Sequence, residues 1–213
     1  MKNVYIFFFQ TQFKTGKTIR FLTRNEYNHV GISFEPDTRL IYSYARYRYY
    51  EPLSAGFGIE ATDRYYGCDK MTNIKVYEYA VEDDHYDRIR EAIDYYLENK
   101  ASTRYNYFDI ITYPFKKHVR LDPTTHTCLS FLLELLERSD VKTIGQLERS
   151  LPSDSIIYEG RLDVFEQGSP SKSDIDFFEK RSRRVVLCAS VLAMSALCAS
   201  VVKKLIFFLE ELV

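Results

Sequence analysis

The sequence predicts an α+β fold, in which an antiparallel sheet of about five or six strands packs against one buried helix. A separate apolar helix is expected at the C-terminus. Three observations lead to this prediction. Short segments rich in β-branched and aromatic residues recur along the first two thirds of the chain. Leu129, Leu132, Leu133 and Leu136 recur at helical spacing. Residues 185–202 contain no charged side chain.

The composition indicates a globular protein with one domain and an appendage. Of the 213 residues, 46% are apolar and 28% are charged, which argues against a disordered chain. The net charge of −1 provides no overall field that would attract nucleic acid. The sequence also shows no glycine-rich phosphate loop and no zinc-finger spacing. We therefore expect no nucleic-acid partner, no metal and no cofactor.

Five segments predict the strands of the sheet. They are residues 3–9, 28–34, 39–44, 73–79 and 155–166. The first is apolar without interruption and is expected at the centre of the sheet, buried on both faces. Residues 45–70 are rich in Tyr, Arg and Gly without a clear period, and we interpret them as a long ordered loop.

Four segments predict helices. They are residues 14–23, 83–98, 107–113 and part of 123–138. In the last of these, Thr125 or Thr127 can serve as the N-cap, which places Cys128 in the first turn of a mostly buried helix. Residues 139–152 are polar and are interpreted as a connector.

The C-terminal part predicts a separate unit. Residues 1–167 form the expected domain, the Ser- and Pro-containing residues 168–184 a linker, and residues 185–213 an apolar helix. At about 1.5 Å per residue, the uncharged run 185–202 spans about 27 Å, close to the thickness of a bilayer core. Two interpretations stay open for this run: contact with a membrane, or a buried or oligomerising helix of a soluble protein.

The cysteines favour a reducing compartment. Cys68, Cys128, Cys188 and Cys198 are widely spaced and suggest no disulfide framework. The short apolar run near the N-terminus is interpreted as a first strand and not as a signal peptide. We therefore expect a cytoplasmic protein, anchored to a membrane by its C-terminal helix if the membrane interpretation holds.

Cys128 is the candidate nucleophile because a helix N-terminus favours the thiolate. A base must then come from elsewhere in the chain. Of the histidines, His85 and His118 are expected on the surface, and His126 lies on the cap of the same helix. His29 begins an apolar strand, where a rigid element could hold it against a cleft. The structural alternatives are that Cys128 is a small buried hydrophobe and His29 a core histidine.

The order of three motifs adds a family resemblance. Residues 28–34 (NHVGISF), 40–44 (LIYSY) and 127–131 (TCLSF) together resemble the permuted papain-like superfamily. This NlpC-like group includes lecithin retinol acyltransferase-like proteins and YiiX/YaeF-like amidases. Residues 157–162 also resemble a closing segment of its bacterial members. The resemblance covers residue 3 to about residue 166, and it implies a strand with the histidine before a helix with the cysteine.

The resemblance implies acyl-transfer chemistry, with Cys128 as nucleophile and His29 as base. The position that orients the histidine corresponds to Ser43, with Glu60 as a substitute from the long loop. The implied activity is hydrolysis of an amide, ester or thioester in a small molecule, peptide or lipid. Two alternatives remain: an acyltransferase or lipid-modifying enzyme at a membrane, and a catalytically inactive binding module. The sequence leaves the oligomeric state open.

Overall fold

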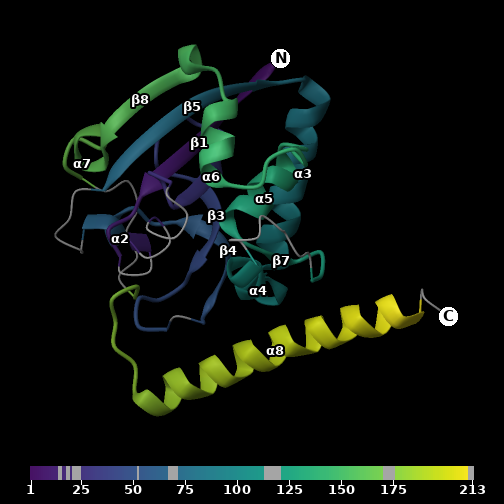
Figure 1. The fold of residues 1–213 in the computed structure, drawn as a ribbon. Coiled ribbons are helices and arrows are strands. Elements are labelled where there is room, and N and C mark those ends of the chain that lie inside the picture. The colour runs from purple at the N-terminus through teal and green to yellow at the C-terminus, as the bar shows by residue number, and fades with distance from the viewer. Residues whose placement is uncertain are drawn as a thin grey trace.

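The computed structural model describes residues 1–13, 16–17, 20, 25–51, 53–66, 72–112, 121–169 and 176–210. These residues form an α+β fold built on a six-stranded sheet (Figure 1). The strand order is β4-β3-β2-β1-β5-β8, and all neighbouring strands are antiparallel. The strands are β1 (Lys2–Gln10), β2 (His29–Ser33), β3 (Ile41–Arg46), β4 (Ala55–Glu60), β5 (Asn73–Val81) and β8 (Ile156–Arg161). A parallel pair, β6 (Arg104–Tyr105) and β7 (Thr125–His126), lies outside this sheet.

Most of the described helices pack on the sheet, and α8 extends away from it. They are α2 (Asp63–Tyr66), α3 (Asp83–Glu98), α4 (Tyr107–Thr112), α5 (Cys128–Leu135), α6 (Ile144–Ser150), α7 (Leu162–Phe165) and α8 (Arg183–Glu210). Two short 3₁₀ turns, η1 (Lys100–Ser102) and η3 (Ser153–Ser155), complete the described elements. The predicted antiparallel sheet, the buried helix after Thr127 and the apolar C-terminal helix are confirmed.

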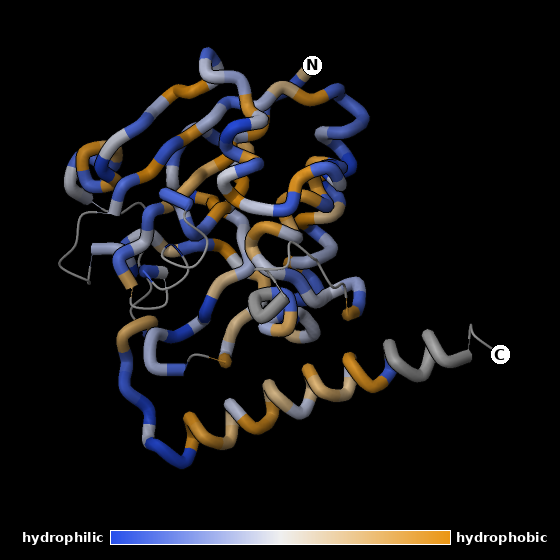
Figure 2. Tube along the Cα trace, in the orientation of Figure 1, coloured by the Kyte–Doolittle hydropathy of each residue, from blue (hydrophilic) through white to orange (hydrophobic). Residues whose placement is uncertain are grey.

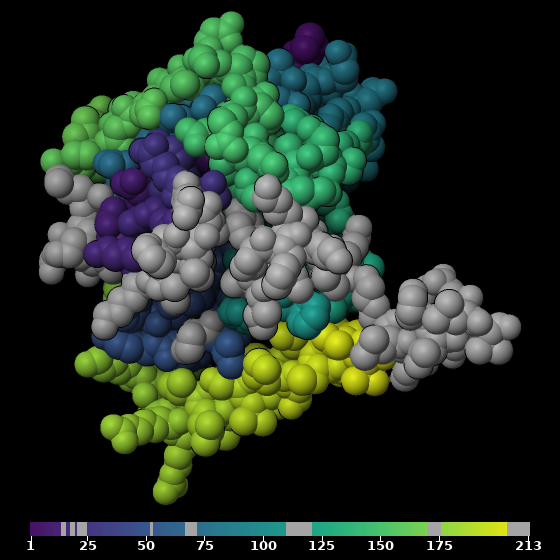
Figure 3. Space-filling view, viewed as in Figure 1, coloured from purple at the N-terminus to yellow at the C-terminus, as the bar shows by residue number. Residues whose placement is uncertain are grey.

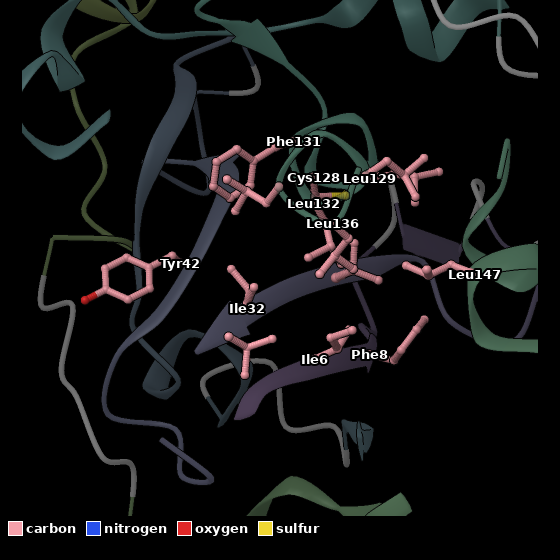
Figure 4. Close-up of a cluster of buried hydrophobic side chains, with 14 of the residues drawn as sticks. Ile6, Phe8, Ile32, Tyr42, Cys128, Leu129, Phe131, Leu132, Leu136 and Leu147 are labelled. Carbon is pink, nitrogen blue, oxygen red and sulfur yellow. The ribbon is translucent and has the colours of Figure 1, made fainter. Parts of the chain in front are cut away.

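Strand β1 separates two apolar cores. Because successive side chains of a strand point to opposite faces, Ile6 and Phe8 join one cluster while Phe7 and Phe9 join another. The first cluster packs against α3, α5 and α6, and Figure 4 shows Ile6 and Phe8 facing the leucines of α5. The second cluster includes residues of α2 and α7. This double burial explains the uninterrupted run of apolar and aromatic residues at 4–9.

Local sequence fixes the start of α5. The Thr127 hydroxyl accepts a hydrogen bond from the Ser130 backbone N–H at 3.0 Å, and the Ser130 hydroxyl accepts one from the Thr127 N–H at 2.8 Å. This capping box satisfies two backbone donors and makes Cys128 the first helical residue. On the facing strand, a Cβ at Gly31 would lie 2.6 Å from Ile41 Cγ2, so glycine permits the close approach of β2 and β3.

Three predictions about secondary structure are wrong: two segments contain elements that were not expected, and one strand is shorter than expected. The region 45–70 contains β4 and α2 and is not one loop. Glycines in β4 weaken the strand signal, yet a Cβ at Gly56 would overlap the Tyr47 hydroxyl, so glycine is required there. The polar connector 139–152 contains α6, which was missed because the helix is short. The last strand was predicted over 155–166, but β8 ends at Arg161 and α7 begins at Leu162. The predicted helix 14–23 lies largely outside the described residues.

The segment before α8 contacts the domain. Residues 176–179 belong to the predicted linker, yet Phe177 is only 1% exposed and joins the second core. The helix α8 then runs along the lower edge of the molecule (Figures 1 and 3). Its stretch Arg183–Lys203 is 21 residues long and apolar enough to cross a membrane, and none of it is buried (Figure 2).

Candidate functional site

His29 stands at the beginning of β2, where its ring packs on Phe9 with centroids 5.7 Å apart. Its Nε2 atom lies 3.1 Å from Oε1 of Glu60, and its side chain is 12% exposed. Burial by itself lowers the pKa of the imidazole. The negative charges of Glu60 and of the Cys128 thiolate outweigh burial and raise the pKa of His29 from 6.5 to about 10. The ring is therefore held as imidazolium at neutral pH.

Cys128 is buried at the first position of α5, where Figure 4 shows its sulfur beside Leu129. The His29 ring, the Val30 backbone and the Tyr105 hydroxyl are the neighbouring groups that favour the thiolate form of Cys128. Burial raises the pKa of the Cys128 thiol, but the charge of His29 and the other effects of these neighbouring groups outweigh it. The pKa of Cys128 therefore lies below its ordinary value of 9.0.

Glu60 ends β4 as a buried carboxylate with a partner for each oxygen. Oε1 faces His29, while Oε2 accepts hydrogen bonds from the Tyr65 hydroxyl at 2.8 Å and from Arg64 Nη1 at 3.4 Å. Burial raises the pKa of this carboxyl. The charges of Arg64 and His29 outweigh burial and lower the pKa of Glu60 from 4.5 to about 2. The site thus contains a permanent buried anion behind the imidazole.

The geometry favours Glu60 over Ser43 as the group that orients His29. The Ser43 hydroxyl lies 3.5 Å from His29 Nε2, but it donates its proton to the Val30 carbonyl at 2.7 Å. Glu60 is closer to the same nitrogen and carries a full negative charge. The family resemblance placed Ser43 first and left Glu60 as a substitute from a region interpreted as loop, whereas β4 brings Glu60 to the sheet beside β3.

Tyr105 is a site residue that sequence analysis did not find. The pairing of β6 with β7 sets Tyr105 opposite His126, close to the start of α5. Its hydroxyl contacts both the thiol and the backbone N–H of Cys128. Burial, followed by the Cys128 charge, raises the pKa of Tyr105 well above 10.0, so this hydroxyl keeps its proton. No local motif separates Tyr105 from the other tyrosines, because a long-range parallel pairing places it here.

The other described histidines have structural partners. His126 is buried, and its Nε2 lies 2.9 Å from both the Tyr96 hydroxyl and the Pro123 carbonyl. His85 was expected in solvent, but its Nε2 lies 2.8 Å from the Leu135 carbonyl. His118 and Cys68 lie outside the described residues.

The structure therefore brings together a thiol, an imidazole and a carboxylate, contributed by α5, β2 and β4. In this arrangement the imidazolium can stabilise the thiolate by its charge and can later donate a proton to a leaving group. A scan of protein-family models, a search of curated proteins and a search of solved structures each returned no match. The chemistry of the site must therefore be argued from its geometry.

Proposed function

We propose that this protein is a cysteine-dependent hydrolase of amide, ester or thioester bonds that works through an acyl-enzyme on Cys128. One observation carries the proposal: the His29 ring lies 3.1 Å from the buried Glu60 carboxylate, on a strand that packs against the helix that begins at Cys128, and the thiol and the imidazole shift each other's pKa. A core histidine needs a hydrogen-bond partner, but it does not need a thiol on one side and an ion-paired carboxylate on the other. Strongly shifted pKa values in such a pair are typical of catalytic sites.

The reaction follows from the positions of these groups. Since Nε2 faces Glu60, Nδ1 is the ring nitrogen available to the thiol. The Cys128 thiolate attacks the carbonyl carbon, and the oxyanion is stabilised by the Cys128 backbone N–H and the Tyr105 hydroxyl. The tetrahedral intermediate then collapses, the imidazolium donates its proton to the departing amine, alcohol or thiol, and the acyl group stays on sulfur. Water, deprotonated by His29, releases the acid and regenerates the thiol.

The same proposal includes a permuted papain-like fold. The chain supplies the base on a strand first, the carboxylate on a neighbouring strand next, and the nucleophile on a late helix. The buried position of Cys128 at a capped helix start agrees with this arrangement. The proposed substrate is a peptide, a small molecule or a lipid that contains an amide, ester or thioester bond. The site residues determine the type of reaction, and they do not select among these acyl groups.

Trapping the acyl-enzyme tests the proposed chemistry. The full chain in detergent is mixed with p-nitrophenyl acetate at pH 6.5, quenched in acid and digested, and the acetylated peptides are identified by mass spectrometry. We expect a rapid acetyl adduct on Cys128 of the folded chain and a much slower one on Cys128 of the chain unfolded in urea, which serves as the control. Equal labelling of the folded and unfolded chains would contradict the proposal and support an inactive binding module.

A second candidate function, acyl transfer at a membrane, is favoured by α8. The exposed apolar side chains of this helix include Val185, Leu187, Val191, Leu192 and Val202. Exposed apolar surface of this extent on a helix long enough to span a bilayer is costly in water. We infer that α8 anchors the domain to a membrane, so that an amine or alcohol of a lipid could replace water as the second nucleophile.

Replacing Leu192 with arginine should release the protein from membranes. Leu192 is 71% exposed and lies in the uncharged part of α8, so the change leaves the two cores untouched. A charge at the middle of a spanning helix costs about 3 kcal/mol of insertion free energy. In flotation with phosphatidylcholine vesicles, we expect the wild type to float and Leu192→Arg to remain largely in the dense fraction. The anchor is contradicted if the wild type does not float, or if both float equally after a carbonate wash.

A further inference from the structure

Phe177 connects the C-terminal segment to the candidate site. Residue 177 lies in the segment before α8, more than one hundred positions from His29 and Glu60, yet its ring is 1% exposed. The ring packs beside Phe13 and Tyr49, with centroids 5.9 and 6.3 Å apart. The Tyr49 backbone N–H donates to the Phe177 carbonyl at 2.8 Å. The segment is thus docked by its backbone as well as by its ring.

Ion pairs hold this segment on both sides of Phe177. Arg48 Nη1 donates to the Asp176 carbonyl at 3.0 Å and to Glu179 Oε2 at 2.7 Å. Beyond them, Arg181 Nε lies 3.5 Å from the buried carboxylate of Glu51. Each of these pairs has one solvent-exposed partner and contributes little individually, but together they fix where the Phe177 ring enters the core.

The ring of Phe177 covers the guanidinium of Arg64. The Arg64 Cζ atom lies 4.4 Å from the ring centroid, within the range of a cation–π contact. The same guanidinium donates to the Arg46 carbonyl at 3.2 Å and to Glu60 Oε2 at 3.4 Å. The bond to Glu60 is long, so its strength depends on how the guanidinium is held and on whether water reaches it.

We propose that Phe177 is a positioning residue for the candidate catalytic site: it holds Arg64 against Glu60, and Glu60 in turn holds His29 toward Cys128. This inference rests on the proposed function. The contacts form one continuous series, from the Phe177 ring to Arg64 at 4.4 Å, from Arg64 to Glu60 at 3.4 Å, and from Glu60 to His29 at 3.1 Å. The segment that leads into the apolar helix is therefore part of the catalytic core.

Loss of the ring should act on the thiol through charge. Without Phe177, water reaches one side of Arg64 and weakens its attraction for Glu60. Glu60 is also faced by Tyr65 of α2 and His29 of β2, while Cys128 is faced by His29 and Tyr105. A less firmly held Glu60 stabilises the imidazolium less, and the imidazolium stabilises the thiolate less. The pKa of Cys128 should then rise.

The experiment measures the rate of Cys128 alkylation by iodoacetamide against pH, in the full chain in detergent. Phe177→Leu keeps the apolar volume but removes the aromatic face, and Phe177→Ala removes both. For both variants we expect the midpoint of the profile to move to higher pH and the rate at pH 6 to fall by about three- to tenfold. The rate at high pH, where the thiol is fully ionised, should stay unchanged.

Phe178→Leu is the matched control. Phe178 lies in the same docked segment and packs on Tyr49 and Phe177, with centroids 5.5 and 4.9 Å apart. We expect the alkylation rate of Phe178→Leu to stay within twofold of wild type at each pH. Phe178 helps to dock the segment, but it is not part of the series that runs from the Phe177 ring through Arg64 and Glu60 to His29. If Phe177→Leu gives the same profile as Phe178→Leu, the positioning role is overturned.

A double-variant cycle separates positioning from general loosening. In an Arg64→Met background the connection to Glu60 is already broken, so Phe177→Leu should cause no further change. A full additional loss in that background would overturn the proposal. The proposed function, on which this inference rests, has its own control: His29→Gln must abolish the high reactivity of Cys128. If it does not, the proposed function fails; if it does while Phe177→Leu has no effect, only the positioning role fails.

Discussion

Replacing His29 with glutamine should slow alkylation of Cys128 at pH 6 by about 100-fold. In the wild type, the imidazolium lowers the pKa of a thiol whose burial would otherwise raise it. Glutamine keeps similar volume and hydrogen-bonding groups but carries no charge. The pKa of Cys128 should then rise, and each unit of that rise reduces the thiolate fraction at pH 6 tenfold. Labelling with iodoacetamide and mass spectrometry of the Cys128 peptide measures the change.

The dependence of the alkylation rate on pH follows from the directions of the two pKa shifts. The wild-type thiolate is lost only when the pH falls through the lowered pKa of Cys128, and the imidazolium persists until the pH approaches about 10, the pKa of His29. We therefore expect the alkylation rate of the wild type to level off at a lower pH than the rate of His29→Gln. Cys128 of the chain unfolded in urea is the reference for an unperturbed thiol. A wild-type profile as steep as that of the unfolded chain would contradict the ion pair.

Acyl transfer should respond even more strongly than alkylation. In the proposed mechanism, His29 protonates the leaving group and later activates water, so its replacement should impair two steps beyond thiolate formation. For a small ester substrate, turnover by His29→Gln should fall by about 1,000-fold or more. A variant that alkylates slowly but still turns over at the wild-type rate would assign the base to another group.

The sequence predicts the positions of the proposed nucleophile and the proposed base because local signals mark both. A Thr cap followed by leucines at helical spacing places Cys128 at a helix start, and an apolar strand begins at His29. Glu60 and Tyr105 lack such signals. Glu60 ends a glycine-containing strand, and Tyr105 depends on a two-residue parallel pairing with residues about twenty positions away. Long-range packing decides both positions, and local patterns carry little information about it.

The linker prediction fails to anticipate Phe177 for a related reason. Ser, Pro and Gly at 168–174 indicate a break in regular structure, and the segment that follows is rich in charge. A single aromatic pair, Phe177 and Phe178, is too short to produce a periodic signal. Its burial depends on contacts with Arg64 of α2 and with Tyr49, which form only in the folded domain. Short anchors of this kind are recognised from contacts and not from periodicity.

The identity of the orienting residue leads to the second large prediction, a comparison of Glu60→Gln with Ser43→Ala. Glutamine can still accept a hydrogen bond from His29, so the change isolates the negative charge. Without that charge the pKa of His29 falls, the imidazolium stabilises the thiolate less, and alkylation of Cys128 at pH 6 should slow by about tenfold or more. Ser43→Ala removes a hydroxyl that bonds mainly to the Val30 carbonyl. Its alkylation rate should stay within about twofold of wild type.

Stability provides an independent readout of the same pair of variants. Glu60→Gln removes the carboxylate that lies 3.4 Å from the buried Arg64, which should cost about 3 kcal/mol in the free energy of unfolding at pH 7. The folded-state pKa of Glu60, about 2, lies below the ordinary 4.5, so its contribution is present above pH 4.5 and is lost as the pH falls toward 2. The difference between wild type and Glu60→Gln in urea unfolding should therefore shrink between pH 5 and pH 3. Ser43→Ala should cost about 1 kcal/mol at both pH values. A larger loss of Cys128 reactivity in Ser43→Ala than in Glu60→Gln would return the orienting role to the hydroxyl.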